Sequence, residues 1–375
     1  MILEYLWLIS FFLHVIPLGV YILYLYYVVK KKSWDVHFDK TYEPNVTLIV
    51  PTYNESSVIT NKLENLKKIQ YPSEKIEFII IDSASSDGTY EKIFSWIKKN
   101  DEQFLLLREE ERKGKSHALN VALKKANGEI VGISDAEATW APGSLCAAIK
   151  YLADANIGAV TGTHRIYSLN ESQAVEVEKT YRSIYQIVNV GESKLHSTPI
   201  FEGELALYRK ALLERFPEDI GADDVGAALG IIQKGYRSIA VPEAIFFEPT
   251  PFSWRERFKQ KIRRAQHVMQ AFYKYRHLLF SNNTVFHNLI FPMNMYIYLL
   301  NPIFGLFFII MSLFLALKYI YLFGLIVFLI IPQIRTLVLT HLSNIFIILF
   351  AYFNELRGNQ QLVWVKIDET RLDAK

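Results

Sequence analysis

Long apolar stretches lie at both ends of the chain, and a stretch of mixed polar and apolar residues lies between them. The first, residues 1–29, carries one formal charge, Glu4. The second, residues 289–353, carries only Lys318 and Arg335. Because charged side chains are rare where a chain crosses lipid, the pattern predicts one water-soluble domain between two membrane regions.

The N-terminal apolar stretch is long enough to span a bilayer. It runs for about 25 residues, and a hydrocarbon core of ~30 Å needs about 20. A cleaved signal peptide is the alternative, but the stretch lacks a basic leader and a small-residue cleavage site. The basic run Lys30–Lys32 follows it, so the positive-inside rule places the next domain in the cytoplasm. We expect residues 1–32 to be a retained anchor of a multi-pass protein of the cell membrane.

The C-terminal apolar stretch, residues 289–355, has room for two or three spans. Three short spans fit roughly 293–317, 319–334 and 336–353, whereas two would make the second about 35 residues long. The number decides on which side the tail, residues 356–375, ends. Arg335 has two interpretations: an interfacial turn residue, which we favour, or a charge facing a polar cavity.

A basic amphipathic helix is expected in residues 251–288. From Arg255 to Arg276 there are eight Lys or Arg residues against one acidic residue. Such a helix is typical of an anionic membrane surface. We expect Phe258, Ile262 and Phe272 to enter the headgroup boundary while basic side chains reach lipid phosphates. A nucleic-acid site is the alternative, but the adjacent spans favour the membrane, and no nucleic-acid partner is expected.

Short apolar runs rich in β-branched residues alternate with helical patterns in the domain of residues 33–250. The expected strands are residues 46–50, 78–81, 104–107 and 130–133, with helices at 59–69, 89–99 and 116–125. Strands that alternate with helices form right-handed βαβ units, so we expect an α/β fold with a doubly wound, mostly parallel sheet. Such sheets bind ligands at the carboxyl ends of their strands.

Missing motifs exclude several other functions. The chain has no G-x-G-x-x-G motif and no P-loop lysine, which argues against a dinucleotide dehydrogenase and a P-loop nucleotidase. Its single cysteine, Cys146, excludes an internal disulfide and a cysteine-rich metal site. His117, His164 and His267 are isolated, and we expect them to be structural or exposed. A transporter would need internal repeats and more spans.

Two carboxylates, Asp135 and Glu137, directly follow the fourth expected strand. Hard oxygen ligands at such a turn suit Mg²⁺ or Mn²⁺, which would bridge the diphosphate of a bound nucleotide. A solvated acidic loop is the alternative if these two residues are taken alone. The other loops of the domain favour the metal site.

Four ordered motifs resemble those of family 2 glycosyltransferases. They are Pro51–Glu55, Asp82–Thr89, Lys113–Asn120 and Asp135–Glu137. The resemblance extends from about Val46 to Gln266. It implies a GT-A fold and transfer of a sugar from a nucleotide sugar with inversion of the anomeric configuration.

The resemblance implies a donor-binding role for the first three motifs. Asp82 would contact the uracil or an equivalent base, with Pro51, Tyr53 and Glu55 beside it. Lys115 would lie near the donor phosphates.

Asp135 and Glu137 take the places of the family's D-x-D pair, whose second carboxylate holds the metal. This sequence has Glu where Asp is usual, and the longer carboxylate can still ligate a divalent ion. The resemblance thus implies Mg²⁺ or Mn²⁺ as cofactor, with Asp135 also beside the donor.

Two later motifs resemble the acceptor side of the family's site. Glu202, Gly203 and Glu204 resemble its glycine loop, and Asp223 and Asp224 stand where its T-E-D motif does. A displacement at the anomeric carbon needs a carboxylate to take the acceptor's proton. We expect Asp224 to be that base, with Asp223 as the close competitor. Either residue could instead cap a helix N-terminus.

The basic helix carries a run that resembles the Q-x-x-R-W motif of membrane polysaccharide synthases. Gln260 and Arg263 are three apart and share a helix face, and Arg263 can bind the donor diphosphate. We place both on the donor side, together with Arg264. Arg264 replaces the Trp, which removes a ring that could stack on an acceptor sugar and weakens the case for a processive polymerase.

The sequence therefore predicts a metal-dependent glycosyltransferase that uses a nucleotide sugar, by resemblance a UDP-sugar. The expected acceptor is a lipid or lipid-linked glycan at the cytoplasmic face of the membrane. Two alternatives stay open: a processive polysaccharide synthase that exports its polymer, and a non-catalytic nucleotide-binding scaffold.

Overall fold

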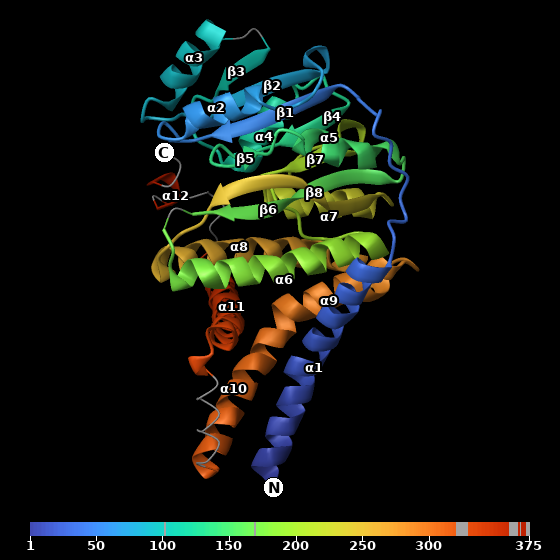
Figure 1. The fold of residues 1–375 in the computed structure, drawn as a ribbon, viewed down its shortest axis with the longest axis vertical. Helices are drawn as coiled ribbons and strands as arrows, with labels where there is room; N and C mark the ends of the chain where they lie inside the picture. The colour runs from blue at the N-terminus through green and yellow to red at the C-terminus, as the bar shows by residue number, and fades with distance from the viewer. Residues whose placement is uncertain (101–102, 169, 320–328, 360–366, 368, 373–375) are drawn as a thin grey trace.

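The computed structural model describes residues 1–100, 103–168, 170–319, 329–359, 367 and 369–372. Three layers follow one another along its long axis (Figure 1). A sheet with helices on both faces forms the first layer. Two long helices, α6 (Gln173–Leu195) and α8 (Trp254–Lys274), form the second, and apolar helices that include the N-terminus form the third.

The strands form a single eight-stranded sheet in the order β3-β2-β1-β4-β7-β6-β8-β5. Their bounds are β1 (Val46–Thr52), β2 (Ile76–Asp82), β3 (Phe104–Arg108), β4 (Ile130–Ile133), β5 (Thr139–Trp140), β6 (Ile157–Tyr167), β7 (Ala206–Arg209) and β8 (Arg237–Pro249). β1 pairs in parallel with β2 and β4, and β2 with β3. β7 is antiparallel to both β4 and β6, while β6 and β8 are parallel. The predicted α/β sheet is confirmed, and its second half is mixed.

Both faces of the parallel half are buried, as its nearly continuous apolar strands require. Leu48 packs on one face with α2 (Ile59–Lys67), α3 (Thr89–Asn100) and α5 (Ser144–Ile149). Its neighbour Ile49 packs on the other face with α4 (Lys115–Leu123) and α7 (Asp223–Gln233). This packing fixes the carboxyl ends of β1, β2 and β4, where the polar loops begin.

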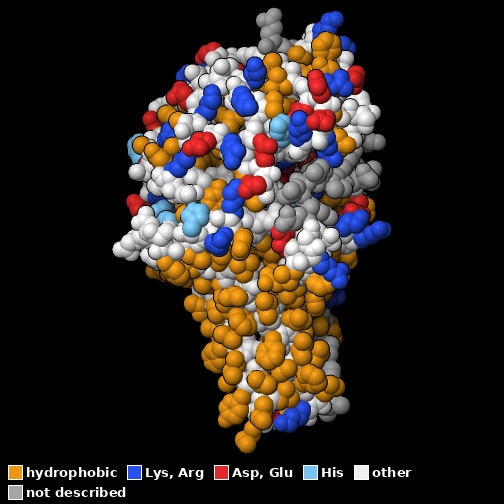
Figure 2. Space-filling view, turned by 180° about the vertical axis from the view of Figure 1, so that it is seen from behind, with side chains coloured by type: hydrophobic (Ala, Val, Ile, Leu, Met, Phe, Trp, Pro, Cys, Tyr) orange, Lys and Arg blue, Asp and Glu red, His pale blue; other side chains and the backbone are white. Residues whose placement is uncertain are grey.

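Three helices in the described part of the chain are long and apolar enough to cross a membrane: Ile2–Lys31, Phe286–Lys318 and Pro332–Leu356. The first is α1, the second contains α9 (Phe291–Met295) and α10 (Asn301–Lys318), and the third is α11. Figure 2 shows an almost uninterrupted apolar surface on this layer, below a charged globular part. The chain is therefore built to sit in a membrane.

Two of these helices lie in the C-terminal region, separated by residues outside the described part. The predicted middle span, 319–334, falls mostly on those residues. Arg335 is exposed in the first turn of α11, where an interfacial residue would lie.

α8 forms where the basic helix was expected, but much of its apolar face is packed against other helices. Phe272 is fully buried and contacts the ring of Phe291 edge-on. Phe258 and Ile262 pack with the buried residues of α8 and α11. The prediction that Phe272 enters the headgroup region is wrong, because it is buried against Phe291; Phe258 and Ile262 are only partly buried, against α11.

Candidate active site

The loops after β1 and β2 are tied to each other at the edge of the sheet. Asn54 and Ala84 both have φ of 55°, a turn conformation that few side chains adopt. The Asn54 backbone N–H donates to Ser85 Oγ at 2.9 Å, and its side-chain oxygen accepts from the Ser86 N–H at 2.9 Å. Asp82 is fully buried beneath them and accepts from the Ser85 N–H. The loops are thus held in a fixed shape.

A small cavity of about 60 Å³ opens beside these loops. Pro51, Tyr53 and Glu55 line it, as do Asp135 and Glu137. The structure therefore brings these five predicted donor-binding and metal-binding residues to one place, whereas Asp82 is not among the residues that line it.

Lys115 forms ion pairs with Asp135, a predicted donor-binding and metal-binding residue, and with Asp223, a predicted catalytic residue. It is the first residue of α4, and Gly114 before it has φ of 104°, a value that favours glycine. Its Nζ lies 2.9 Å from Asp135 Oδ1 and 3.2 Å from Asp223 Oδ2. Burial opposes ionisation of Lys115, but the carboxylates hold its pKa well above the usual value. A fixed positive charge at this point suits a bound phosphate.

Asp224 accepts a hydrogen bond from the backbone N–H of Gly203 at 3.1 Å. A Cβ on Gly203 would lie 3.2 Å from Lys115 Nζ and 3.3 Å from Asp224 Oδ2, so only glycine fits without displacing them. Burial and the neighbouring Asp223 carboxylate raise the pKa of Asp224 to about 8. The helix begins after Ala222, so neither aspartate occupies the N-cap position.

Glu137 and Glu55 both contact a short helix near the end of the chain, α12 (Glu369–Leu372). Arg371 forms ion pairs with both carboxylates and is almost fully buried. Glu369 accepts from the backbone N–H groups of Phe252 and Ser253, just before α8 begins. A segment from the far end of the chain thus reaches the predicted metal-binding residue.

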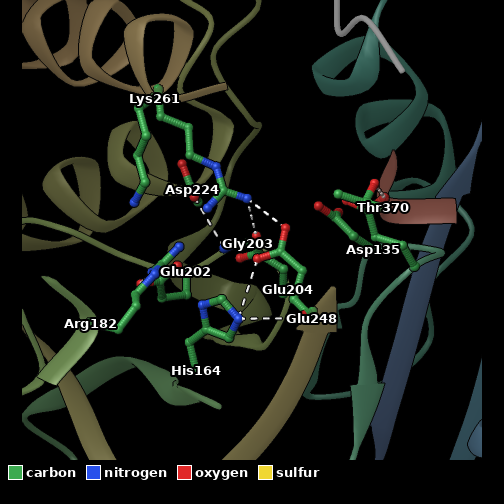
Figure 3. A network of polar contacts seen from close by, with 12 residues as sticks. Asp135, His164, Arg182, Glu202, Gly203, Glu204, Asp224, Glu248, Lys261 and Thr370 are labelled. Carbon is green, nitrogen blue, oxygen red and sulfur yellow. Dashed lines mark hydrogen bonds and ion pairs between the residues drawn. The ribbon is translucent and has the colours of Figure 1, made fainter. Parts of the chain in front are cut away.

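Both acidic residues of the glycine loop are paired with arginines. Figure 3 shows Glu202, Gly203 and Glu204 together with Arg182 and Asp224. Arg182 of α6 binds Glu202 at 2.5 Å. Arg264 of α8 binds Glu204 at 2.9 Å and Glu248 of β8 at 2.7 Å. Arg264 therefore fastens α8 to the sheet at the position where the related motif has Trp.

A buried carboxylate, Glu178 of α6, holds the basic side of α8. Arg257 and Lys261 of α8 lie 3.2 Å and 2.5 Å from its oxygens, and Arg182 lies 3.0 Å away. Burial lowers the pKa of Lys261 to about 7. The prediction that the basic side chains of this helix reach lipid phosphates is wrong for these residues. Gln260 is also buried.

One cavity of about 810 Å³ connects the carboxylates that were predicted to be catalytic with the apolar helices. At one end it is lined by Asp135, Asp223 and Asp224, and Arg263 and Arg264 line it from α8. At the other end the lining comes from α1, α6, α10 and α11, and most of it is apolar. The lining thus changes from charged at one end to mostly apolar at the other.

Comparison with known proteins identifies the family. The family model described as "Glycosyl transferase family 2" matches residues 47–216. A solved mannosyltransferase of Pyrobaculum calidifontis, in complex with GDP-Man and Mn²⁺, is 34% identical. The match covers 95% of this chain and 100% of that one, with a TM-score of 0.79. The chain belongs to glycosyltransferase family 2.

Two curated proteins are also similar to this chain. Poly-beta-1,6-N-acetyl-D-glucosamine synthase of Staphylococcus aureus is 29% identical over 250 residues, which are 64% of this chain and 58% of that protein. A probable glycosyltransferase, YdaM of Bacillus subtilis, is 25% identical over 234 residues, 60% and 55% of the two chains. The chain thus spans less than two thirds of the length of these relatives. It is a glycosyltransferase of GT-A fold, as predicted.

The residues expected to hold a divalent ion fit that role chemically. Asp135 and Glu137 offer hard oxygen ligands that line both cavities. Asp135 pairs with Lys115, and Glu137 pairs with Arg371, so these two carboxylates attract positive charge. No group of three His, Cys, Asp or Glu residues suited to a metal occurs in the described residues.

Several contributors to the site were not found in the sequence. Arg371, Arg182, Glu178 and Glu248 lie outside the recognisable motifs. Their role comes from contacts between distant segments: Arg371 meets Glu55 across 316 positions of the chain. His267 was expected to be structural or exposed, yet it lines the large cavity.

Proposed function

We propose that this glycosyltransferase moves one sugar from a nucleotide sugar to a lipid-linked acceptor at the cytoplasmic face of the membrane. The observation that carries the proposal is the cavity that joins Asp223 and Asp224 to the apolar helices. A soluble acceptor would not need a route into the membrane layer, whereas a lipid tail would occupy it.

In the proposed reaction an acceptor hydroxyl attacks the anomeric carbon as the bond from that carbon to the donor phosphate breaks. The configuration inverts because the nucleophile enters opposite the leaving diphosphate. Asp224 takes the proton, and its raised pKa makes it a strong base when ionised. Lys115 and Arg263 are placed to bind the departing diphosphate. A divalent ion held by Asp135 and Glu137 would supply further stabilisation of that charge.

The donor is a nucleoside diphosphate sugar. The sequence resemblance favours a UDP-sugar, whereas the solved Pyrobaculum calidifontis relative carries GDP-Man. Both belong in the first donor screen, with the base expected near Asp82 and Tyr53. The ring of Tyr53 lies 3.7 Å from the guanidinium of Arg112, which gives the site a flat surface beside the buried carboxylate.

A second candidate is processive polymer synthesis, which the name of the Staphylococcus aureus relatives supports. Against it, Arg264 is locked between two carboxylates and offers no stacking ring. The apolar lining of the cavity also suits a lipid tail better than a hydrated polymer.

The test is transfer by the full-length protein in detergent or liposomes. Nucleotide sugars labelled in the sugar are incubated with lipid-linked acceptors, and the products are sized by mass spectrometry. We expect products longer by one sugar. A ladder of long products would support the synthase instead, and label appearing only on water-soluble acceptors would refute both.

A further inference from the structure

Helix α2 carries a lysine on the face that packs in the core. The buried positions of this helix are Ile59, Lys62, Leu63 and Leu66, and their spacing of three and four residues defines one face. Lys62 is 1% exposed, while the three apolar side chains pack in the core beside β1. A lysine on such a face loses its hydration, which costs stability. A residue that breaks the local pattern at this cost marks a candidate functional position.

The amine of Lys62 holds both ends of the turn that carries the predicted metal ligands. Its Nζ donates to Ser134 Oγ and, at 2.7 Å, to the backbone oxygen of Ala138. These two residues flank the segment from Asp135 to Glu137. Burial lowers the pKa of Lys62 to about 7. The neutral amine still has two N–H donors, so both hydrogen bonds can form in either protonation state.

Further hydrogen bonds connect the same turn with the glycine loop. Ser134 Oγ donates to the backbone oxygen of Glu204 at 3.0 Å, and Trp140 Nε1 donates to that oxygen at 2.8 Å. The residue before Glu204 is Gly203, whose N–H binds the predicted base. Lys62 is therefore at one end of a chain of contacts that leads to the acceptor side of the site.

Lys62 acts through this turn, because it is not among the described residues that line either cavity. A turn fixed at both ends holds Asp135 and Glu137 in place before the ion arrives, which reduces the cost of ordering them on binding. We infer that Lys62 is a positioning residue for the divalent ion and the donor diphosphate, and that through Ser134 it also fixes the glycine loop relative to them. This inference rests on the metal and donor roles given in the proposed function.

The first test is Mn²⁺ binding by Lys62→Met in the full-length protein in detergent. Met removes both hydrogen bonds and keeps an unbranched side chain of similar length. The dissociation constant of Mn²⁺, measured with UDP or GDP present, should rise roughly tenfold, the low end of the loss that follows removal of outer partners of metal ligands. The number of ions bound per protein should stay the same. Electron paramagnetic resonance of free Mn²⁺ measures both quantities without any turnover.

Lys67→Met is the matched control. Lys67 lies on the same helix, is exposed, and rests over the ring of Trp96 at 5.6 Å. This variant should leave Mn²⁺ affinity unchanged. An unchanged affinity in Lys62→Met would overturn the inference. Fewer ions per protein at unchanged affinity would also overturn it, because that result indicates partial unfolding and a purely structural lysine.

Ser134→Ala tests the connection to the glycine loop, and it decides alone if Lys62→Met does not fold. The substitution removes the contact with Glu204, while Lys62 keeps its bond to Ala138. For sugar transfer kcat should fall by roughly 2- to 10-fold, the effect of one lost hydrogen bond, with the donor KM nearly unchanged. An unchanged kcat, with or without a rise in the donor KM, would contradict the role of Lys62 in fixing the loop.

The inference and the proposed function fail in different ways. Weaker Mn²⁺ binding in Lys62→Met, with no transfer to any lipid-linked acceptor, would support the inference and refute the proposed acceptor. Transfer to a lipid-linked acceptor, with Lys62→Met equal to the wild type in Mn²⁺ affinity, would leave the proposed function standing and remove the role of Lys62.

Discussion

Asp223 and Asp224 are adjacent on the first turn of α7, but they have different partners. Asp223 is paired with Lys115, whereas Asp224 accepts only from backbone N–H groups, those of Gly203 and Val225, among the hydrogen bonds of the described residues. A carboxylate without a cationic partner is the better proton acceptor. Asp224→Asn keeps the shape and removes that function, so turnover should fall by about 10² to 10⁴ with donor affinity nearly unchanged.

The pH profile provides the complementary readout for the same residue. Only ionised Asp224 accepts a proton, and its pKa is raised to about 8, so kcat/KM should rise with pH and level off above that value. Asp224→Asn should lack this limb of the profile. If Asp223→Asn is the inactive variant and Asp224→Asn retains turnover, the base has been assigned to the wrong residue.

Glu137 is expected to ligate the divalent ion against the donor diphosphate. Excess chelator should abolish transfer, and Glu137→Ala should weaken donor binding, as measured by titration of the nucleotide in the presence of Mn²⁺. Glu129→Ala is the control, because that exposed carboxylate lies outside both cavities. Undiminished activity in excess chelator would contradict the metal assignment.

At this scale the sequence predicted which residue types gather at the site. Asp135, Lys115 and Asp223 were each named from their motifs, and the structure joins them directly. Motifs encode local runs, so they did not show that Glu137 is paired with Arg371 or that Glu204 is paired with Arg264. Those pairings depend on how separate segments come together.

Among the elements, α6 carries the carboxylate that organises α8. Glu178 is 2% exposed and pairs with Arg182, Arg257 and Lys261. Glu178→Gln would leave three cations without their common partner and should lower the free energy of unfolding by roughly 3–5 kcal/mol.

The matched control lies two residues away on the same helix. Glu176 is exposed and pairs with Lys179, so Glu176→Gln should change stability by less than about 1 kcal/mol. Chemical denaturation in a mild detergent measures both variants. Equal effects would show that the buried cluster does not hold α8 in place.

α12 is the element that the sequence did not anticipate. Arg371 pairs with Glu137, one of the two expected ligands of the divalent ion, and the two cations would repel each other. Arg371→Ala should therefore strengthen Mn²⁺ binding in the absence of donor, on the order of tenfold for the loss of one nearby like charge.

The control for this variant is Arg357→Ala, which removes an exposed arginine that stacks on Phe353. Titration followed by the electron paramagnetic resonance of free Mn²⁺ measures both. Weaker binding in Arg371→Ala would mean that the arginine supports the metal site rather than competing with the ion.

The elements themselves were largely predictable. Short apolar runs located β1, β2, β3 and β4, because both faces of that part of the sheet are buried, and helical spacing located the helices between them. α8 was located correctly and oriented incorrectly. Its pattern defines an apolar face and a basic face, but only tertiary packing decides that α11 covers the first and Glu178 the second.

For the whole molecule, the basic run after α1 predicts that the globular part faces the cytoplasm. Cys146 is the single cysteine of the chain and is exposed on that part. In intact cells it should resist a membrane-impermeant maleimide and react only after permeabilisation, as followed by mass shift.

A Lys318→Cys substitution in a Cys146→Ser background supplies the opposite reporter. Lys318 lies at the far end of α10, where it pairs with Glu4 of α1 at 2.5 Å. Its cysteine should react in intact cells. Labelling of Cys146 in intact cells would mean that the globular part lies outside the cell, which contradicts the proposed topology.

The cavity between α6 and α8 also determines how an acceptor could arrive. A molecule whose tail lies among α1, α10 and α11 comes to the enzyme by lateral diffusion within the bilayer, not from the surrounding water. Its encounter rate is then set by its mole fraction among the lipids, and adding inert lipid or detergent dilutes it even when the amount of acceptor per millilitre is constant. For such an enzyme the reaction takes place in the membrane, and the effective acceptor concentration is an amount per membrane area rather than per volume.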